Sequence, residues 1–233
     1  MSFDDVKADF DNRVGEVDQY LKVLDRLNNP AVVLFDSVTR RRKRVLEEGS
    51  LKVMKATVFL LIYNVVESSI RSGFEYLYAN IKSQGSTPSA VRDELVQVWI
   101  RQRFRALDAD SVSTRNFRDL AESIVEEVVA GSVLDLDSKL LPVSGNLDAE
   151  RIREVCAKHG VSSNVHYRSL GGTELITVRK QRNALAHGNT TFSECGQQYT
   201  VSDLIRINNQ AQIFVRGILK NIEKYVSAKE YEK

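Results

Sequence analysis

The chain has 233 residues, and its 33 lysines and arginines against 31 aspartates and glutamates give a formal net charge of +2 at pH 7. This balance excludes a histone-like polycation, although local basic patches can still bind nucleic acid. With 42% hydrophobic residues but only three prolines and twelve glycines, the composition argues against both long disorder and a barrel of many short strands.

The N-terminal half is predicted to be helical almost throughout. Apolar residues at steps of three and four predict a long helix from Phe3, ended by Asn28-Asn29-Pro30. A second, more basic helix is expected over 32–47, followed by Gly49-Ser50. The most regular pattern, over 59–81, predicts a long central helix. After a loop at 83–88, two more helices are expected, over 91–105 and 117–128.

The C-terminal half combines an irregular stretch with two further helices. Residues 132–172 are interrupted by glycines and a proline, and we interpret them as an insertion whose one short helix, 149–159, is capped by Asp148. We expect a helix over 173–187, a loop over 190–199, and a last helix opened by a capping box of Thr200 and Asp203. The predicted organisation is therefore 1–131, the insertion 132–172 and 173–233, with the first and last parts forming one all-α bundle.

Several kinds of site are disfavoured because their motifs are missing. The sequence has no GxGxxG, GxxxxGK[ST], HExxH or GxSxG pattern, so neither a cofactor nor a metal is expected. The two cysteines, Cys156 and Cys195, form no CxxC pair and fit a reducing compartment. The longest apolar stretch, 58–66, is short against the roughly 20 residues of a membrane span. We therefore expect a cytoplasmic protein.

One segment contains side chains that could bind a phosphate and transfer a proton. Between Val178 and Asn189, three cations and a histidine lie at the end of a helix. Arg182 presents a fork of donors that matches a phosphate, and His187 can exchange a proton near neutral pH. Asn183 is one turn before His187, so these two share a face. A simpler interpretation is that arginine and histidine only complement the dipole of the helix C-terminus.

The segment Arg-Asn-Ala-Leu-Ala-His-Gly, 182–188, resembles the R-x(4–6)-H signature of the HEPN superfamily (higher eukaryotes and prokaryotes nucleotide-binding domain). The context is similar too, since a late helix, a loop and a closing helix follow one another. The run from 56 to 225 looks most like a small prokaryotic HEPN subfamily associated with toxin–antitoxin and phage-defence loci. The tyrosine that some HEPN toxins carry two residues after the histidine is replaced here by Asn189, so silencing through that tyrosine is not supported.

The resemblance implies a HEPN-like all-α bundle that acts as a metal-independent endoribonuclease. Two copies of the motif would line one cleft of a homodimer. His187 would act as acid and base, Arg182 would hold the scissile phosphate, and Asn183 would orient the phosphate or His187. The implied partners are RNA and an antitoxin or another regulatory protein.

Weaker site candidates surround this motif. Glu67 and Asn64, on the central helix, could support Arg182 or His187, although an exposed ion pair of Glu67 with Arg71 is the favoured alternative. Arg179 and Lys180 are candidate RNA contacts. So is the basic run Arg40, Arg41, Arg42, Lys43 and Arg44, for which a solvated helix face is an equal alternative. For the aromatic residues Tyr63, Tyr78 and Trp99, core packing is favoured over base stacking.

The sequence is also compatible with two other functions. The chain could be a non-catalytic HEPN module that binds RNA, nucleotide or a protein partner. It could also be a helical interaction protein in which the motif is a coincidence, and Arg182 and His187 on separate exposed faces of a monomer would favour that interpretation.

Overall fold

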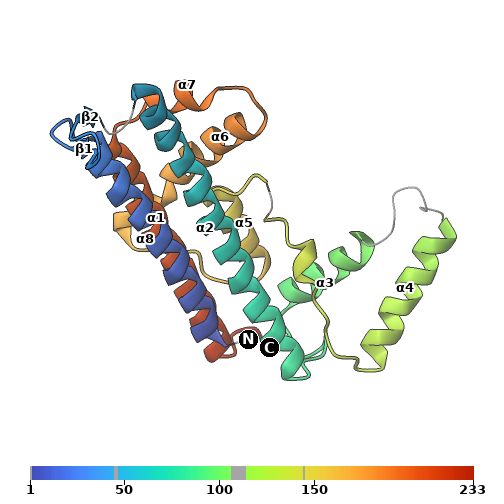
Figure 1. The fold of residues 1–233 in the computed structure, drawn as a ribbon. Coiled ribbons are helices and arrows are strands. Elements are labelled where there is room, and N and C mark those ends of the chain that lie inside the picture. The colour runs from blue at the N-terminus through green and yellow to red at the C-terminus, as the bar shows by residue number, and fades with distance from the viewer. Residues whose placement is uncertain (1, 45–46, 106–113, 144) are drawn as a thin grey trace.

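The computed structural model describes residues 2–44, 47–105, 114–143 and 145–233. Three long helices run side by side and form the body of the molecule: α1 (Phe3–Asn28), α2 (Glu48–Ser83) and α8 (Val201–Ser227) (Figure 1). The shorter helices are α3 (Asp93–Arg105), α4 (Thr114–Val129), α5 (Ala149–Lys158), α6 (Glu174–Ala186) and α7 (Phe192–Gln197). The predicted all-α class is confirmed.

Periodic apolar side chains hold the long helices together. In α1 the buried residues are Val6, Phe10, Val14, Val17, Leu21 and Leu24, which form the predicted stripe. Polar contacts fix the pairing of α1 with α8, because Asp18 Oδ1 accepts hydrogen bonds from Asn208 Nδ2 at 2.8 Å and Gln212 Nε2 at 2.9 Å. The predicted capping box of Thr200 and Asp203 opens α8, with both reciprocal bonds present.

The central helix α2 is longer than predicted. It begins at Glu48, so Gly49 and Ser50 lie inside it instead of separating two helices. An 18-residue window of α2 has a mean hydropathy of 1.4, enough by length and composition to cross a membrane. The core helix of a soluble protein passes the same test, and α1, α6, α7 and α8 pack against α2 here.

The prediction of a basic helix over 32–47 is wrong. The chain forms an antiparallel hairpin instead, β1 (Val33–Phe35) paired with β2 (Arg42–Arg44). The side chain of Asp36 explains the turn, because its Oδ1 accepts the backbone N–H groups of Val38 and Thr39 at 2.9 and 3.0 Å. Such local bonds compete with helix formation. The β-branched and aromatic residues of β1 favour a strand.

The predicted loop over 190–199 also contains a helix, α7. Its capping box joins Thr191 and Glu194, which form a Thr-x-x-Glu signal in the sequence. Gly196 brings α7 directly onto α2, since a Cβ atom built at Gly196 would lie 1.8 Å from the carbonyl oxygen of Lys52. A glycine is therefore required where these two helices meet.

The segment 132–172 wraps along the bundle and is partly helical. It holds the short 3-10 turn η2 (Ser138–Leu140), then α5, then the 3-10 segment η3 (Tyr167–Gly172). The predicted cap of α5 is confirmed, because Asp148 Oδ1 accepts from Arg151 N at 3.0 Å. Before this segment, α3 and α4 project from the bundle as an arm (Figure 1).

Candidate functional site

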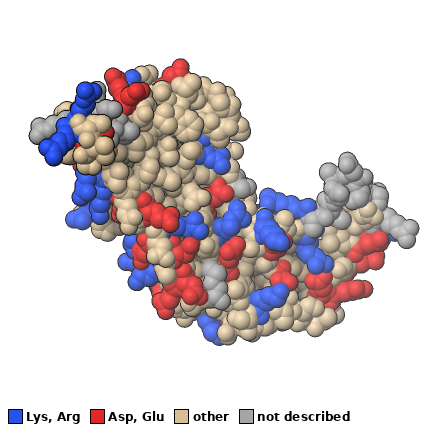
Figure 2. Space-filling model, viewed as in Figure 1, with Lys and Arg blue, Asp and Glu red and all other residues tan. Residues whose placement is uncertain are grey.

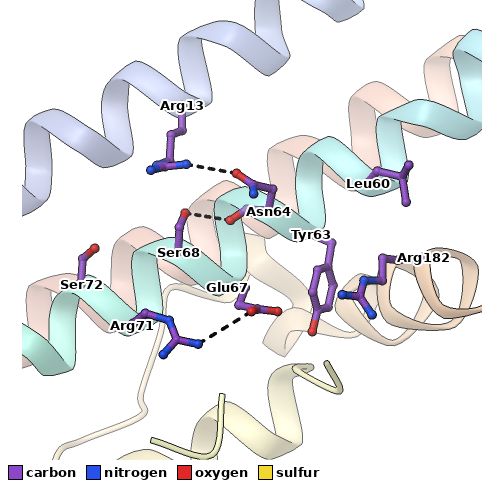
Figure 3. A pocket seen from close by; sticks show the side chains of 9 residues that line it. All are labelled: Arg13, Leu60, Tyr63, Asn64, Glu67, Ser68, Arg71, Ser72 and Arg182. Carbon is purple, nitrogen blue, oxygen red and sulfur yellow. Dashed lines mark hydrogen bonds and ion pairs between the residues drawn. The ribbon is translucent and has the colours of Figure 1, made fainter. Parts of the chain in front are cut away.

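A hollow of about 420 Å³ opens on the face where α1, α2 and α6 meet. Polar side chains dominate its walls: Arg13 from α1; Tyr63, Asn64, Glu67, Ser68, Arg71 and Ser72 from α2; and Arg182 from α6. Figure 3 shows that the guanidinium groups lie around Asn64 and Glu67. The structure thus brings three predicted site residues, Arg182, Glu67 and Asn64, to one place.

Arg182 is positioned by an aromatic ring and by two oxygen atoms. Its guanidinium carbon lies 4.4 Å from the centroid of the Tyr63 ring, a cation–π arrangement (Figure 3). Its Nη1 donates to Asn183 Oδ1 at 2.9 Å and to the carbonyl of Gly145 at 3.4 Å. These contacts leave other N–H groups of the planar fork able to bind an anion.

The side chain of Asn183 is hydrogen-bonded to the guanidinium of Arg182. While its Oδ1 accepts from Arg182, its Nδ2 donates to Asn146 Oδ1 at 2.8 Å. The predicted alternative, in which Asn183 orients His187, has a backbone counterpart only, the bond from His187 N to Asn183 O at 3.0 Å. Asn183 therefore ties the motif helix to the segment that precedes α5.

Tyr63, like Arg13 and Arg71, lines this site but was not predicted as a site residue from the sequence. It was assigned to the core, and it is indeed buried, with 3% of its surface exposed. Its ring nevertheless supports Arg182, and its hydroxyl accepts the N–H of Leu147 at 3.2 Å. Burial raises the pKa of Tyr63, so its hydroxyl stays protonated at neutral pH. Its position directly before Asn64 and four residues before Glu67 gave no separate signal.

Glu67 makes two contacts, one for each interpretation offered from the sequence: an ion pair with Arg71, and support of Arg182. Its Oε1 lies 3.8 Å from Arg71 Nη2, the ion pair of the simpler alternative. Its Oε2 also accepts the backbone N–H of Gly145 at 3.4 Å, so it holds the same segment that touches Arg182. Asn64 faces α1, where its Oδ1 accepts from Arg13 Nη1 at 3.1 Å.

His187 lies apart from the hollow. It is the C-cap residue of α6 and is exposed, followed by Gly188 with a φ of +69°. It is not among the residues that line the hollow. Within one chain, the structure therefore places Arg182 in a wall and His187 on the neighbouring surface, where a second molecule can reach it.

The other residues predicted to contact RNA are not among the described residues that line the hollow. Arg179 Nε lies 3.0 Å from Asp148 Oδ2, so this arginine is paired with the cap of α5. Lys180 is exposed. Arg40 and Arg41 are exposed at the hairpin, while the side chains of Arg42, Lys43 and Arg44 lie outside the described part of the structure. Since α1 continues for 15 residues beyond Arg13, the hairpin is about 22 Å along the bundle from the hollow.

The described residues offer no metal site, because no three histidine, cysteine, aspartate or glutamate side chains among them gather at a distance suited to an ion. Burial raises the pKa of the thiols of Cys156 and Cys195, to about 12 and about 11. The protonated form of these thiols is a poor nucleophile. The charged side chains that line the hollow are three arginines and Glu67, among the described residues.

A family model matches almost the whole chain, residues 3–231, and it describes the MAE_28990-like HEPN family. The chain belongs to this family. No curated protein and no solved structure matches it. The HEPN match extends beyond the run 56–225, on which the resemblance was based, and includes α1 and with it Arg13. The matched range includes the arginine–histidine motif, 182–188.

Proposed function

We propose that this HEPN protein is a metal-independent endoribonuclease that cuts RNA at a cleft between two copies of the chain. The observation that supports this most is the setting of Arg182. Its guanidinium is held by Tyr63, Asn183 and the carbonyl of Gly145, and it borders an open hollow. His187 is exposed at the end of the same helix.

The proposed chemistry follows from these two side chains. One His187 takes the proton from the ribose 2′-hydroxyl, and the His187 of the second copy protonates the leaving 5′-oxygen. Arg182 binds the scissile phosphate and stabilises the charge that develops on it. The products carry a 2′,3′-cyclic phosphate and a 5′-hydroxyl. We further propose that the enzyme is a cytoplasmic toxin or defence effector held in check by an antitoxin or another regulatory protein.

The test is cleavage of total cellular RNA by the purified protein in excess EDTA. The wild type should cut, whereas His187→Ala and Arg182→Ala should not. His166→Ala is the matched control, because His166 is also exposed but is the N-cap residue of η3, outside the motif. Cleavage by His187→Ala at the wild-type rate would remove the assignment.

A second function has an observation in its favour. His187 does not line the hollow that contains Arg182, so in a single chain the described residues of the hollow present arginines without a histidine beside them. A non-catalytic HEPN module that binds RNA, nucleotide or a protein partner would need no more than this. Binding of RNA by the wild type without cleavage, across several RNA classes, would favour that function.

A further inference from the structure

Arg13 and Arg71 bring two cations into the hollow in addition to Arg182. Arg13 is contributed by α1 and Arg71 by α2, and neither belongs to the R-x(4–6)-H motif. Figure 3 shows their guanidinium groups on the side of the hollow away from Arg182, with Asn64, Ser68 and Glu67 between them. The hollow is thus basic on two opposite sides.

The existing partners of these arginines leave donors available. Arg13 Nε pairs with Asp9 at 2.8 Å and its Nη1 with Asn64 at 3.1 Å. Arg71 lies 3.8 Å from Glu67, too far for a short hydrogen bond. Because a guanidinium has five N–H donors, both arginines keep some for a ligand. Their side chains are about a third exposed, at 36% and 32%.

The charge of the hollow favours an anion. Glu67 is the one carboxylate among the described residues that line it, against three guanidinium groups. The volume of about 420 Å³ lies within the range of small-molecule sites. Arginine forks match the oxygen atoms of a phosphate in geometry as well as in charge.

We infer that the hollow is a phosphate-binding site in which Arg13 and Arg71 hold a second phosphate, next to the one bound by Arg182. The phosphate is either a phosphodiester of the RNA chain, which would then run across α2, or the phosphate group of a free nucleotide. The first source rests on the proposed function, since it takes the ligand of Arg182 to be RNA. The binding itself does not depend on cleavage.

The experiment measures fluorescence anisotropy of a labelled single-stranded 2′-O-methyl RNA of about eight nucleotides, which has no 2′-hydroxyl to start cleavage. Arg13→Gln and Arg71→Gln should each weaken binding about fivefold. They should also lower the slope of log K against log salt by about 0.7, the value for one lost phosphate contact to a single strand. Arg26→Gln, an exposed arginine on α1 outside the hollow, is the matched control and should leave the slope unchanged.

Glu67→Gln tests the same phosphate site, but this variant should tighten RNA binding instead of weakening it. It removes the negative charge while keeping an oxygen to accept the Gly145 N–H, so binding should tighten about twofold to fivefold. Loss of structure alone would weaken binding in every variant. Thermal unfolding of each variant separates that effect.

A titration with ATP and with inorganic phosphate distinguishes the two sources. Weakening by Arg13→Gln and Arg71→Gln for RNA alone supports the phosphodiester, and weakening for ATP alone supports the free nucleotide. Wild-type affinity and salt slope in both variants, for RNA and for ATP, would overturn the inference. Missing cleavage in EDTA, with the expected binding changes intact, would instead count against the proposed endoribonuclease and leave the phosphate site standing.

Discussion

Tyr63 carries two separate tasks in one side chain, and substitutions can separate them. Tyr63→Phe removes the oxygen that accepts the N–H of Leu147 but keeps the ring beneath Arg182. A buried N–H without a partner costs about 1–3 kcal/mol, so the free energy of unfolding should fall by this amount while the affinity for RNA stays close to wild type.

Tyr63→Leu removes the ring as well, and should weaken RNA binding beyond any loss of stability because the guanidinium of Arg182 loses its support. Chemical denaturation and anisotropy on both variants check the pair. Equal RNA affinity in Tyr63→Phe and Tyr63→Leu would contradict a role for the ring.

The buried side chain of His159 should make the free energy of unfolding depend on pH. It is buried, its Nδ1 donates to the carbonyl of Val155 at 2.6 Å, and its Nε2 accepts from the hydroxyl of Tyr78 at 2.7 Å. Burial lowers the pKa of His159 from 6.5 to about 4. Between these two values the unfolded chain binds the proton and the folded chain does not, so acid favours unfolding in this window.

The free energy of unfolding should therefore fall as pH drops from about 6.5 towards 4, by up to about 1.4 kcal/mol per pH unit from this residue. Urea unfolding at about pH 7, 6 and 5 measures it. His159→Gln should show a shallower decline than the wild type, and His166→Gln, at an exposed position, should match the wild type. An unchanged decline in His159→Gln would reject this source of acid sensitivity.

At the scale of elements, the contact of α7 with α2 leaves no room for a side chain at Gly196. Gly196→Ala would place a methyl group 1.8 Å from the carbonyl oxygen of Lys52, and this oxygen is backbone that cannot rotate away. We expect α7 to shift off α2 and the protein to lose about 3 kcal/mol or more of stability.

Gly15→Ala is the matched control for Gly196→Ala. It lies inside α1 with open space around its Cβ position and should stabilise the protein by about 0.5–1 kcal/mol. Melting temperatures of the two variants should move in opposite directions. A small effect of Gly196→Ala would mean that α7 is loosely attached.

The elements that sequence predicts best are those whose periodic pattern is long. The helices α1, α2 and α8 follow from steps of three and four. The hairpin was missed because the cations of 40–44 were assigned to a helix face, whereas the turn depends on the Asp36 side chain. The helix α7 was missed because six residues give almost no period, although its Thr191–Glu194 box was present in the sequence.

The site was predictable only in part, for a similar reason. Arg182, Glu67 and Asn64 were found through the motif and through polar residues on a long apolar helix. Arg13 could not be found, because its spacing within α1 says nothing about which helix lies opposite. The contacts of Gly145 and Asn146 with the motif depend on a non-helical segment, whose path no local pattern determines.

At the scale of the whole molecule, the α3–α4 arm differs from the rest. Phe104 packs against Phe117, and Arg103 pairs with Glu127 at 2.6 Å, which holds α4 to α3. Beyond these contacts α4 exposes apolar side chains, including Val129 with 82% of its surface exposed. Figure 2 shows acidic side chains towards the α4 end of the arm and basic ones towards α3.

Because α4 buries little apolar surface, its hydrogen bonds should open at a lower free energy than those of the bundle. We expect the amides of α4 to exchange with deuterium well before those of α2 and α8, under conditions where the bundle stays folded. Peptide-resolved hydrogen exchange checks this. Equal protection of α4 and α8 would show that the arm is covered in solution, for example by a second copy of the chain.

The hollow draws its walls from both ends of the chain, with Arg13 near the beginning and Arg182 near the end. A ribosome that makes this protein has released α1 and α2 long before the motif helix is synthesised. Any unfinished or prematurely terminated chain shorter than 182 residues therefore lacks Arg182 and His187 altogether. If the protein attacks the RNA of its own cell, this order of synthesis means that α1 and α2 are made before any part of the chain carries the motif.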